Sequence, residues 1–194
     1  MECSYSTILG GVIMQGVERH KVRLLPHCEE WKEEFEEVKK QLKEIFGDNV
    51  NDIQHVGSTS ISGIYAKPIL DIAIVLKSFE DMNIEGMKKA GYDYCGTQNN
   101  KRNRYLFVLR GEGEISLRHI HCYESNNVDF YFVTRFIDFL NEHKEYAKEY
   151  SDLKISLAKQ YPDDRNTYTD KKESFVRMIY QKIDSGKYKG DIIK

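Results

Sequence analysis

Apolar residues recur at helical spacing in the stretch that follows Pro26. They lie three or four positions apart, and they are Trp31, Phe35, Val38, Leu42 and Ile45. This spacing places them on one face of a helix and leaves acidic and basic residues on the opposite face. Because Gly47 ends the pattern, we predict one amphipathic helix that packs on a core through its apolar face.

Two stretches in the first half of the chain predict strands. Residues 52–56 form the shorter one, and residues 69–76 form a nearly continuous run of branched apolar side chains. Such a run is typical of a central strand that is buried on both faces. Asp71 is the only charged residue within it. Residues 57–67, between the two strands, are predicted to form a turn followed by a short helix.

The remaining pattern predicts further strands and then helices. We expect a strand at residues 22–25, a helix at 79–90, strands at 104–110 and 114–123 joined by the turn Gly111-Glu112-Gly113, helices at 128–140, 142–160 and 171–184, and a polar loop at 162–166. This order predicts an α+β fold, in which helices flank a small mixed β-sheet and the C-terminal third is helical. The length of 194 residues suits one domain, at residues 21–185. An N-terminal extension of uncertain structure precedes it at residues 1–20, and a polar tail follows at 186–194.

Composition narrows the classes of function. The formal net charge of -2 argues against a broad nucleic-acid-binding surface. No apolar run approaches the roughly 20 residues of a membrane-spanning helix, and the N-terminus lacks the basic segment of a signal peptide. The four cysteines are scattered, with no Cys-x-x-Cys pair, which is typical of reduced thiols. We therefore expect a cytoplasmic protein without a membrane partner.

The turn at Gly57-Ser58 is the first candidate for chemistry. A turn between a strand and a helix presents backbone N–H groups and a hydroxyl, which suits a bound phosphate. It is not a Walker A loop, because no Gly-Lys-Ser/Thr follows at the required spacing. The alternative is that Ser58 or Ser60 only caps the helix.

Asp71 and a pair of histidines are candidate metal ligands. A carboxylate in an apolar strand costs several kcal/mol unless it is paired, hydrogen-bonded or bound to a metal. His119 and His121 are two residues apart, so on a strand they point to the same face. They could bind a metal, exchange protons or contact phosphate, or they could simply line a solvated cleft. His55, beside the turn, could serve only to orient it.

These residues belong to longer motifs. The central block runs from His55-Val56-Gly57-Ser58-Thr59-Ser60 to Ala66-Lys67-Pro68-Ile69-Leu70-Asp71-Ile72. Further segments are Gly91-Tyr92, His119-Ile120-His121, Arg135-Phe136-Ile137-Asp138-Phe139-Leu140, Tyr150-Ser151-Asp152-Leu153-Lys154, and Tyr168 with Lys172 and Phe175. Together they resemble the GrpB family of the nucleotidyltransferase superfamily, over about residues 21–184. The resemblance implies a nucleotidyltransferase-like fold and, by analogy, the use of a nucleoside triphosphate.

The resemblance and the residue chemistry together suggest a set of roles. Phosphate or nucleotide binding would fall to Gly57, Ser58, Lys67, Arg135, Lys154, Tyr168 and Lys172. Metal binding would fall to Asp71, His119 and His121, and catalysis to Asp71 and His121. Taken singly, a basic residue of this kind is more often a solvated helix residue than a ligand-binding one. One departure stands out, because the superfamily usually carries a second acid two residues after the first, where this chain has Ala73.

Three functions remain as hypotheses. The first is metal-dependent transfer of a nucleotidyl or phosphoryl group from a nucleoside triphosphate to an unknown acceptor. The second is a catalytically degenerate protein that binds a nucleotide or other phosphorylated small molecule, which Ala73 favours. The third is a metal-dependent phosphoester hydrolase that uses Asp71, His119 and His121. The expected cofactor is Mg²⁺ or Mn²⁺, with Zn²⁺ less favoured, and the expected partner is the phosphorylated ligand.

Overall fold

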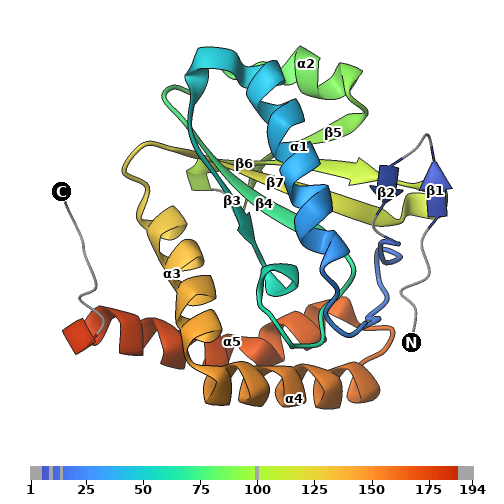
Figure 1. The fold of residues 1–194 in the computed structure, drawn as a ribbon, viewed down its shortest axis with the longest axis vertical. Helices are drawn as coiled ribbons and strands as arrows, with labels where there is room; N and C mark the ends of the chain where they lie inside the picture. The colour runs from blue at the N-terminus through green and yellow to red at the C-terminus, as the bar shows by residue number, and fades with distance from the viewer. Residues whose placement is uncertain (1–5, 9–10, 14, 99–100, 188–194) are drawn as a thin grey trace.

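A five-stranded mixed sheet forms the centre of the molecule. The computed structural model describes residues 6–8, 11–13, 15–98 and 101–187. The strand order is β3-β4-β7-β6-β5 (Figure 1). The strands are β3 (Val50–Val56), β4 (Leu70–Leu76), β5 (Tyr92–Gln98), β6 (Lys101–Arg110) and β7 (Ser116–Glu124). β4 and β7 run parallel and the other neighbours antiparallel, so the predicted mixed sheet is confirmed.

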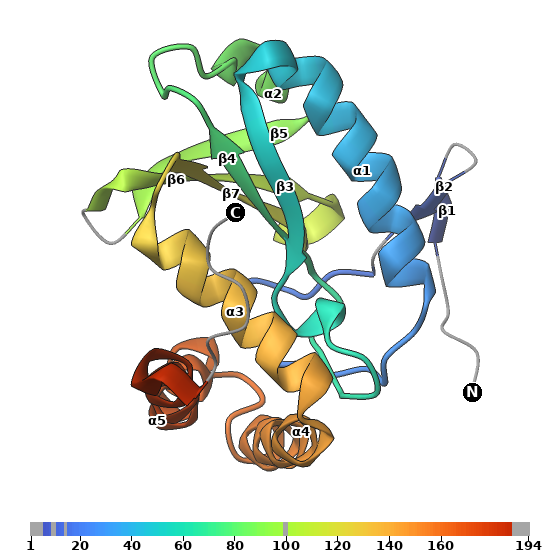
Figure 2. The ribbon, with the colours of Figure 1, turned by 60° about the vertical axis from the view of Figure 1, so that its left-hand side comes forward.

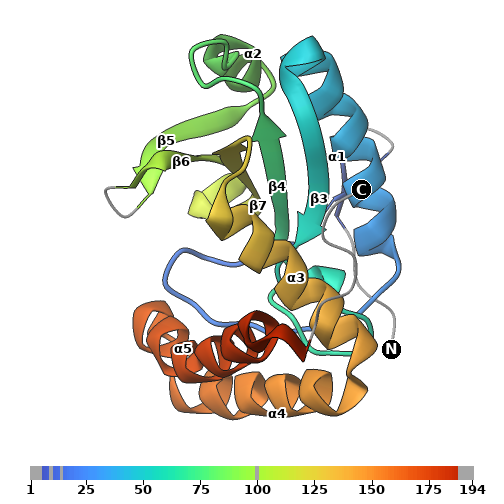
Figure 3. The ribbon, with the colours of Figure 1, turned by 90° about the vertical axis from the view of Figure 1, so that its left-hand side faces the viewer.

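Helices lie on both faces of this sheet. They are α1 (Glu30–Phe46), α2 (Ile84–Lys89), α3 (Val128–Glu142), α4 (Lys144–Gln160) and α5 (Arg165–Lys182). α1 lies on one side of the sheet and α3 on the other (Figure 3). α4 and α5 pack together beyond the end of the sheet where β3 stops and β4 starts, and Figure 2 views them nearly end-on. The predicted α+β fold with a helical C-terminal third is therefore confirmed.

Alternation along β4 divides the interior into two cores. Ile72 and Ile74 are fully buried in the core beneath α1. Ala73 and Val75 are buried in the other core, which α3, α4 and α5 complete. Because successive strand residues point to opposite faces, Asp71 shares the second face with Ala73. The only charge of the central strand thus points toward the helical third of the molecule.

The amphipathic pattern of α1 matches its packing. The residues predicted to face the core are buried, apart from a half-buried Ile45; the buried ones are Trp31, Phe35, Val38 and Leu42. Gly47 stops the helix with a φ of 51°, as its position in the pattern indicated. α1 also buries a carboxylate that the pattern did not reveal. Glu34 is 2% exposed and pairs with Arg118 of β7 at 2.8 Å.

Several predicted elements need correction. Residues 22–25 do not form a strand of the sheet, and Leu25 makes only an isolated bridge to Ala66. The helix predicted at 79–90 begins at Ile84, because Asn83 caps it by accepting a hydrogen bond from the N–H of Gly86. Residues 57–67 hold one 3₁₀ turn, Ser58–Ser60, and no longer helix.

Two further differences concern β5 and α5. β5 was not predicted, and it pairs with β6 through an irregular register that weakens its alternating pattern. α5 begins at Arg165, six residues before the predicted start at residue 171. Asp164 caps this helix, since its side chain accepts a hydrogen bond from the N–H of Thr167. The predicted loop at 162–166 is shortened accordingly.

The N-terminal region contains a small hairpin. β1 (Ser6–Ile8) pairs antiparallel with β2 (Gly11–Ile13), and β2 lies against α1. The boundaries at residues 20/21 and 185/186 stay predictions, and residues 1–5 and 188–194 lie outside the described part of the chain. Within the part that the structure describes, no helix is both long and apolar enough to cross a membrane.

Candidate functional site

The turn after β3 is folded tightly against Asp71. Gly57 has a φ of 73°, a conformation that favours glycine. A Cβ atom at this position would lie 2.5 Å from Oδ2 of Asp71, so the close approach also requires glycine. Val56 stands opposite Asp71 in the β3–β4 ladder, so the turn that follows Val56 begins beside Asp71. The turn is therefore built around the carboxylate.

The serines of the turn have different roles. Ser60 closes it, because its Oγ donates a hydrogen bond to the carbonyl oxygen of Gly57 at 2.7 Å. Ser58 lies beside Tyr150 of α4 and acts to lower the pKa of its hydroxyl, although burial has the larger effect and raises this pKa to about 12. Ser60 thus has the local structural role that the sequence left open. Ser58 instead links the turn to the helical third.

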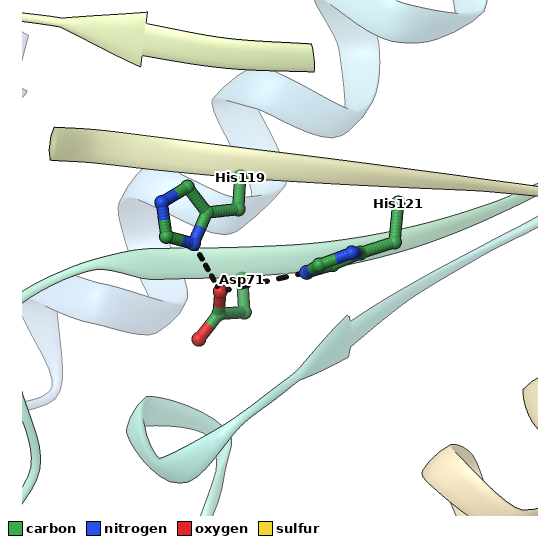
Figure 4. A group of neighbouring side chains, drawn as sticks. All are labelled: Asp71, His119 and His121. Atoms are coloured by element: carbon green, nitrogen blue, oxygen red, sulfur yellow. Dashed lines mark hydrogen bonds and ion pairs between the residues drawn. The ribbon is translucent and has the colours of Figure 1, made fainter. Parts of the chain in front are cut away.

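Asp71 lies beside both candidate histidines. His119 is directly opposite Asp71 in the parallel β4–β7 ladder, and His121 is opposite Ala73. Nδ1 of His119 is 2.9 Å from Oδ1 of Asp71, and Nε2 of His121 is 3.7 Å from the same oxygen (Figure 4). The three ligand atoms all lie within 4.8 Å of one another. Among the described residues, this is the only such cluster of His, Cys, Asp or Glu side chains.

The two histidines stabilise the negative charge of Asp71. Burial acts to raise the pKa of its carboxyl group. The hydrogen bond with His119 and the positive charge of both histidines outweigh burial and hold this pKa well below its usual range. Asp71 is therefore ionised at neutral pH. Its partners are the imidazoles of His119 and His121.

Three lysines from separate segments meet around two tyrosine rings. Lys67 lies just before β4, Lys154 on α4 and Lys172 on α5. Nζ of Lys67 and Nζ of Lys172 lie 5.6 Å and 4.5 Å from the centre of the Tyr168 ring. Nζ of Lys154 lies 4.6 Å from the centre of the Tyr150 ring. We call these three lysines the lysine cluster.

The lysine cluster is poorly solvated. Lys154 is 1% exposed, and its Nζ donates a hydrogen bond to the carbonyl oxygen of Tyr65. Burial, with the charges of Lys172 and Lys67, lowers the pKa of Lys154 to about 6. Burial and neighbouring cations likewise lower the pKa of Lys67 to about 7. Burial lowers the pKa of Lys172 to about 8, against the opposing charge of Asp71. An anion at this position would restore the charged state of all three.

Arg165 belongs to this region although the sequence did not single it out. It begins α5, and its charge lowers the pKa of both Lys67 and Lys172. The sequence placed residue 165 in a loop, so no helix face pointed to it. The signal that could have identified it is Asp164, because a helix-capping residue at this position places the start of α5 at Arg165.

Arg135 and His55 have structural partners of their own. Arg135 lies on α3, where its guanidinium pairs with Asp138 at 3.4 Å and lies over the ring of Tyr131. His55 stacks on Phe35 of α1, and its Nε2 is 2.9 Å from Oγ1 of Thr59. Burial lowers the pKa of His55 to about 4, so its ring is neutral at pH 7. His55 therefore supports the turn from the face opposite to Asp71.

Ala73 is fully buried and leaves no carboxylate two residues after Asp71. Its neighbour across the β4–β7 ladder is His121, whose imidazole occupies the adjoining part of the same face. The side chains of Asp71 and His121 remain 28% and 24% exposed, so both can reach a ligand. The site thus combines one carboxylate and two imidazoles with cations from the helical third.

Comparison with known proteins identifies the family. The model of the family described as GrpB protein matches residues 21–182. The Glutamate-rich protein GrpB of Alkalihalophilus pseudofirmus is 34% identical over 188 residues, 88% of this chain and 100% of that protein. The UPF0157 protein YqkA of Bacillus subtilis is 37% identical over 161 residues, 82% of this chain and 46% of that protein. The crystal structure of the conserved protein GrpB from Enterococcus faecalis has a TM-score of 0.76 and 28% identity, over 82% of this chain and 96% of that chain. With a match over most of its length, the chain belongs to the GrpB family.

Proposed function

We propose that this chain is a nucleotidyltransferase-like enzyme, which transfers a nucleotidyl or phosphoryl group from a nucleoside triphosphate to an acceptor. The observation that carries the proposal is an ionised carboxylate that lies close to cations from other elements. Asp71 is held ionised by two imidazoles, and its charge acts on Lys67 and Lys172. A triphosphate with a divalent cation presents the complementary charges.

In this proposal the phosphates lie between the turn and the lysine cluster. The backbone N–H groups and hydroxyl at Gly57-Ser58 would contact one phosphate. The lysine cluster and Arg165 would neutralise the charge of the others. Tyr168 holds Lys67 and Lys172 in place through its ring. Arg135 would act from α3 on a more distant part of the ligand.

The residues present fit a divalent cation. Asp71, His119 and His121 offer an oxygen and two nitrogens within 4.8 Å of one another. A cation bound there would neutralise charge that develops on the phosphate oxygens. Catalysis would otherwise consist of positioning and electrostatic stabilisation by the chain.

The chemistry requires one proton acceptor. In nucleotidyl transfer, an acceptor oxygen bonds to the α-phosphorus while the bond to the bridging oxygen breaks and pyrophosphate leaves. The proton of the acceptor hydroxyl would pass to Asp71 or His121, the two groups exposed beside that position.

Two other functions have their own support. Ala73 removes the second carboxylate, which favours a protein that binds a nucleotide or phosphorylated ligand without turning it over. The Asp71-His119-His121 cluster, with open positions for water, favours a metal-dependent phosphoester hydrolase. We expect a cytoplasmic location under each of them, because nucleotides and reduced thiols are found there.

A thermal-shift panel separates these functions. The panel would contain ATP, GTP, CTP and UTP, each alone and with Mg²⁺, Mn²⁺ or Zn²⁺. A ligand present at 100 times its Kd adds about 2.7 kcal/mol, which raises Tm by several degrees. We expect a shift that needs both nucleotide and metal, and that falls in Lys172→Ala. Lys159→Ala, an exposed lysine on α4, is the matched control and should behave like the wild type.

The panel also contains outcomes against the proposal. A nucleotide shift that is indifferent to metal and unchanged in Asp71→Ala would support the binding protein instead. Release of phosphate from a nucleotide in water alone, lost in Asp71→Ala, would support the hydrolase. No shift with any nucleotide would reject nucleotide use altogether.

A further inference from the structure

The candidate metal ligands of this site are chemically unlike a pair of carboxylates. Position 73, two residues after Asp71, is an alanine, and the side chain beside it across the β4–β7 ladder is His121. His119 stands beside Asp71 itself. The parallel register of β4 and β7 therefore places two imidazoles on the face where a second acid would project.

The spacing of the three side chains suits a single ion. Ligands about 2.1 Å from a first-row metal and at right angles to each other lie ~3.0 Å apart, and tetrahedral ligands lie slightly farther apart. Oδ1 of Asp71 is 2.9 Å from Nδ1 of His119 and 3.7 Å from Nε2 of His121 (Figure 4). Only small side-chain adjustments are needed for the three atoms to share one ion.

The donor types then select the class of metal. Mg²⁺ prefers six oxygen ligands and keeps several waters, so one carboxylate is a weak site for a pair of such ions. Imidazole nitrogens suit first-row transition metals such as Co²⁺ and Zn²⁺, which bind N/O sites in the Irving–Williams order. Two imidazoles and a carboxylate leave coordination positions open for a phosphate oxygen or water.

We propose that Asp71, His119 and His121 form a mononuclear site for a first-row transition-metal dication, and that Mg²⁺ is not its physiological ion. This inference deepens the proposed function and rests on it only for the role of the metal in group transfer. It also decides between two roles of His121. A nitrogen bound to a metal cannot accept a proton, so Nε2 of His121 is then a ligand and not the proton acceptor.

Metal titration without nucleotide tests this site directly. The protein, stripped of metal with a chelator, is titrated with Mn²⁺, Co²⁺ and Zn²⁺ by calorimetry, and with Mn²⁺ by electron paramagnetic resonance. We expect one ion per chain, with affinity rising from Mn²⁺ to Co²⁺ to Zn²⁺. Millimolar Mg²⁺ should leave this binding unchanged. His119→Ala and His121→Ala should each weaken binding at least about tenfold, and His20→Ala, an exposed histidine, should not.

A second variant covers the case in which an alanine variant does not fold. His121→Asp keeps a ligand at the same position and replaces nitrogen by oxygen. We expect it to lower the affinity for Zn²⁺ relative to Mg²⁺ by at least about tenfold, because the donor set becomes harder. The Co²⁺ complex adds a spectroscopic readout, since its visible absorption depends on the ligand set.

Clear results would overturn the inference. They are no binding of any transition metal, equal competition by Mg²⁺, or wild-type affinity in both histidine variants. In those cases the two imidazoles serve only to stabilise the charge of Asp71. If the chain binds no transition metal but binds nucleotide in the thermal-shift panel, the proposed function stands and only this metal site is rejected. A chain that binds Zn²⁺ but no nucleotide retains the metal site alone.

Discussion

Gly57 meets two steric demands that an alanine cannot meet together. Its φ is 73°, and a Cβ would lie 2.5 Å from Oδ2 of Asp71. Gly63, in the same connection, has a φ of 77° but no heavy atom within 4 Å of the corresponding position. Comparing the two glycines therefore separates backbone strain from contact with the site.

The alanine variants at these positions should differ. Gly63→Ala should cost about 1 kcal/mol of unfolding free energy, because only the positive φ is penalised. Gly57→Ala should cost at least about 1 kcal/mol more, since the methyl group also displaces the Asp71 carboxylate. Urea denaturation measures both losses, and the metal titration should weaken only in Gly57→Ala. Equal losses in the two variants would mean that Asp71 moves aside freely.

Lys154 shows why a residue buried in one helix can serve a distant turn. It is 1% exposed, and its Nζ donates to the carbonyl oxygen of Tyr65. The N–H of Tyr65 in turn donates to Oγ of Ser151 at 3.0 Å. These two bonds attach α4 to the connection that carries Lys67. A neutral lysine amine donates the first of these bonds equally well, so Lys154 can gain a proton when an anionic ligand binds.

At the scale of elements, α1 is attached to the sheet by a buried ion pair. Glu34 and Arg118 lie 2.8 Å apart, with side chains 1% and 14% exposed. Burial raises the pKa of the Tyr92 hydroxyl beside them, and Arg118 counteracts this by its charge. The pair lies on the α1 face, away from the candidate site, because Arg118 stands opposite Leu70 in the ladder.

Breaking this pair should destabilise the chain without affecting the site. Arg118→Met should cost about 3 kcal/mol, because it leaves the Glu34 carboxylate buried without its partner. Glu34→Leu combined with Arg118→Met should recover most of that loss, since no charge is then buried. Thermal or urea unfolding of the single and double variants measures the coupling. If the double variant is no more stable than Arg118→Met, the loss of the ion pair is not the cause of the destabilisation.

The helices α4 and α5 complete the site from outside the sheet. β4 and β7 supply Asp71, His119 and His121, while α4 and α5 supply Lys154 and Lys172. Tyr150 of α4 lies beside Ser58 of the turn. The ring of Tyr168 on α5 contacts Lys67 and Lys172. The cation and anion sites thus belong to different elements, and their separation depends on how the helical third packs on the turn.

For the whole molecule, the lysine cluster makes stability depend on pH. Its folded-state pKa values, about 6, 7 and 8, lie below the ordinary value of 10.5. The unfolded chain therefore binds more protons than the folded chain between about pH 6 and 10. The contribution of the cluster to the unfolding free energy consequently rises with pH in this window. A bound polyphosphate would reverse the trend, because it favours charged lysines.

This dependence can be measured in a variant. Lys154→Met should lower the slope of unfolding free energy against pH between pH 7 and 9, by up to about 1.4 kcal/mol per pH unit. Lys159→Met, at an exposed position of the same helix, should keep the wild-type slope. Inorganic triphosphate should stabilise the wild type more at pH 7 than at pH 9. Identical slopes in all three proteins would show that Lys154 is charged in the folded state throughout.

Much of the fold was predictable because its signals are local. The spacing of Trp31, Phe35 and Leu42 identified α1, and the branched run around Asp71 identified β4. The sequence does not predict β5, because its bulged register interrupts the alternation of polar and apolar residues. It does not predict the start of α5 either, because the capping Asp164 lies in a polar stretch that is typical of a loop. Both failures concern features whose pattern is short or broken.

By itself, the sequence determined the mixed sheet, the Gly57 turn, the single acid on β4 and the family, because each depends on periodicity or on a contiguous motif. Only the tertiary structure decided which side chains meet. Strand register placed His119 beside Asp71 and His121 beside Ala73, and helix packing brought the lysine cluster and Arg165 to the turn. These contacts join residues far apart in the chain, so no local pattern encodes them.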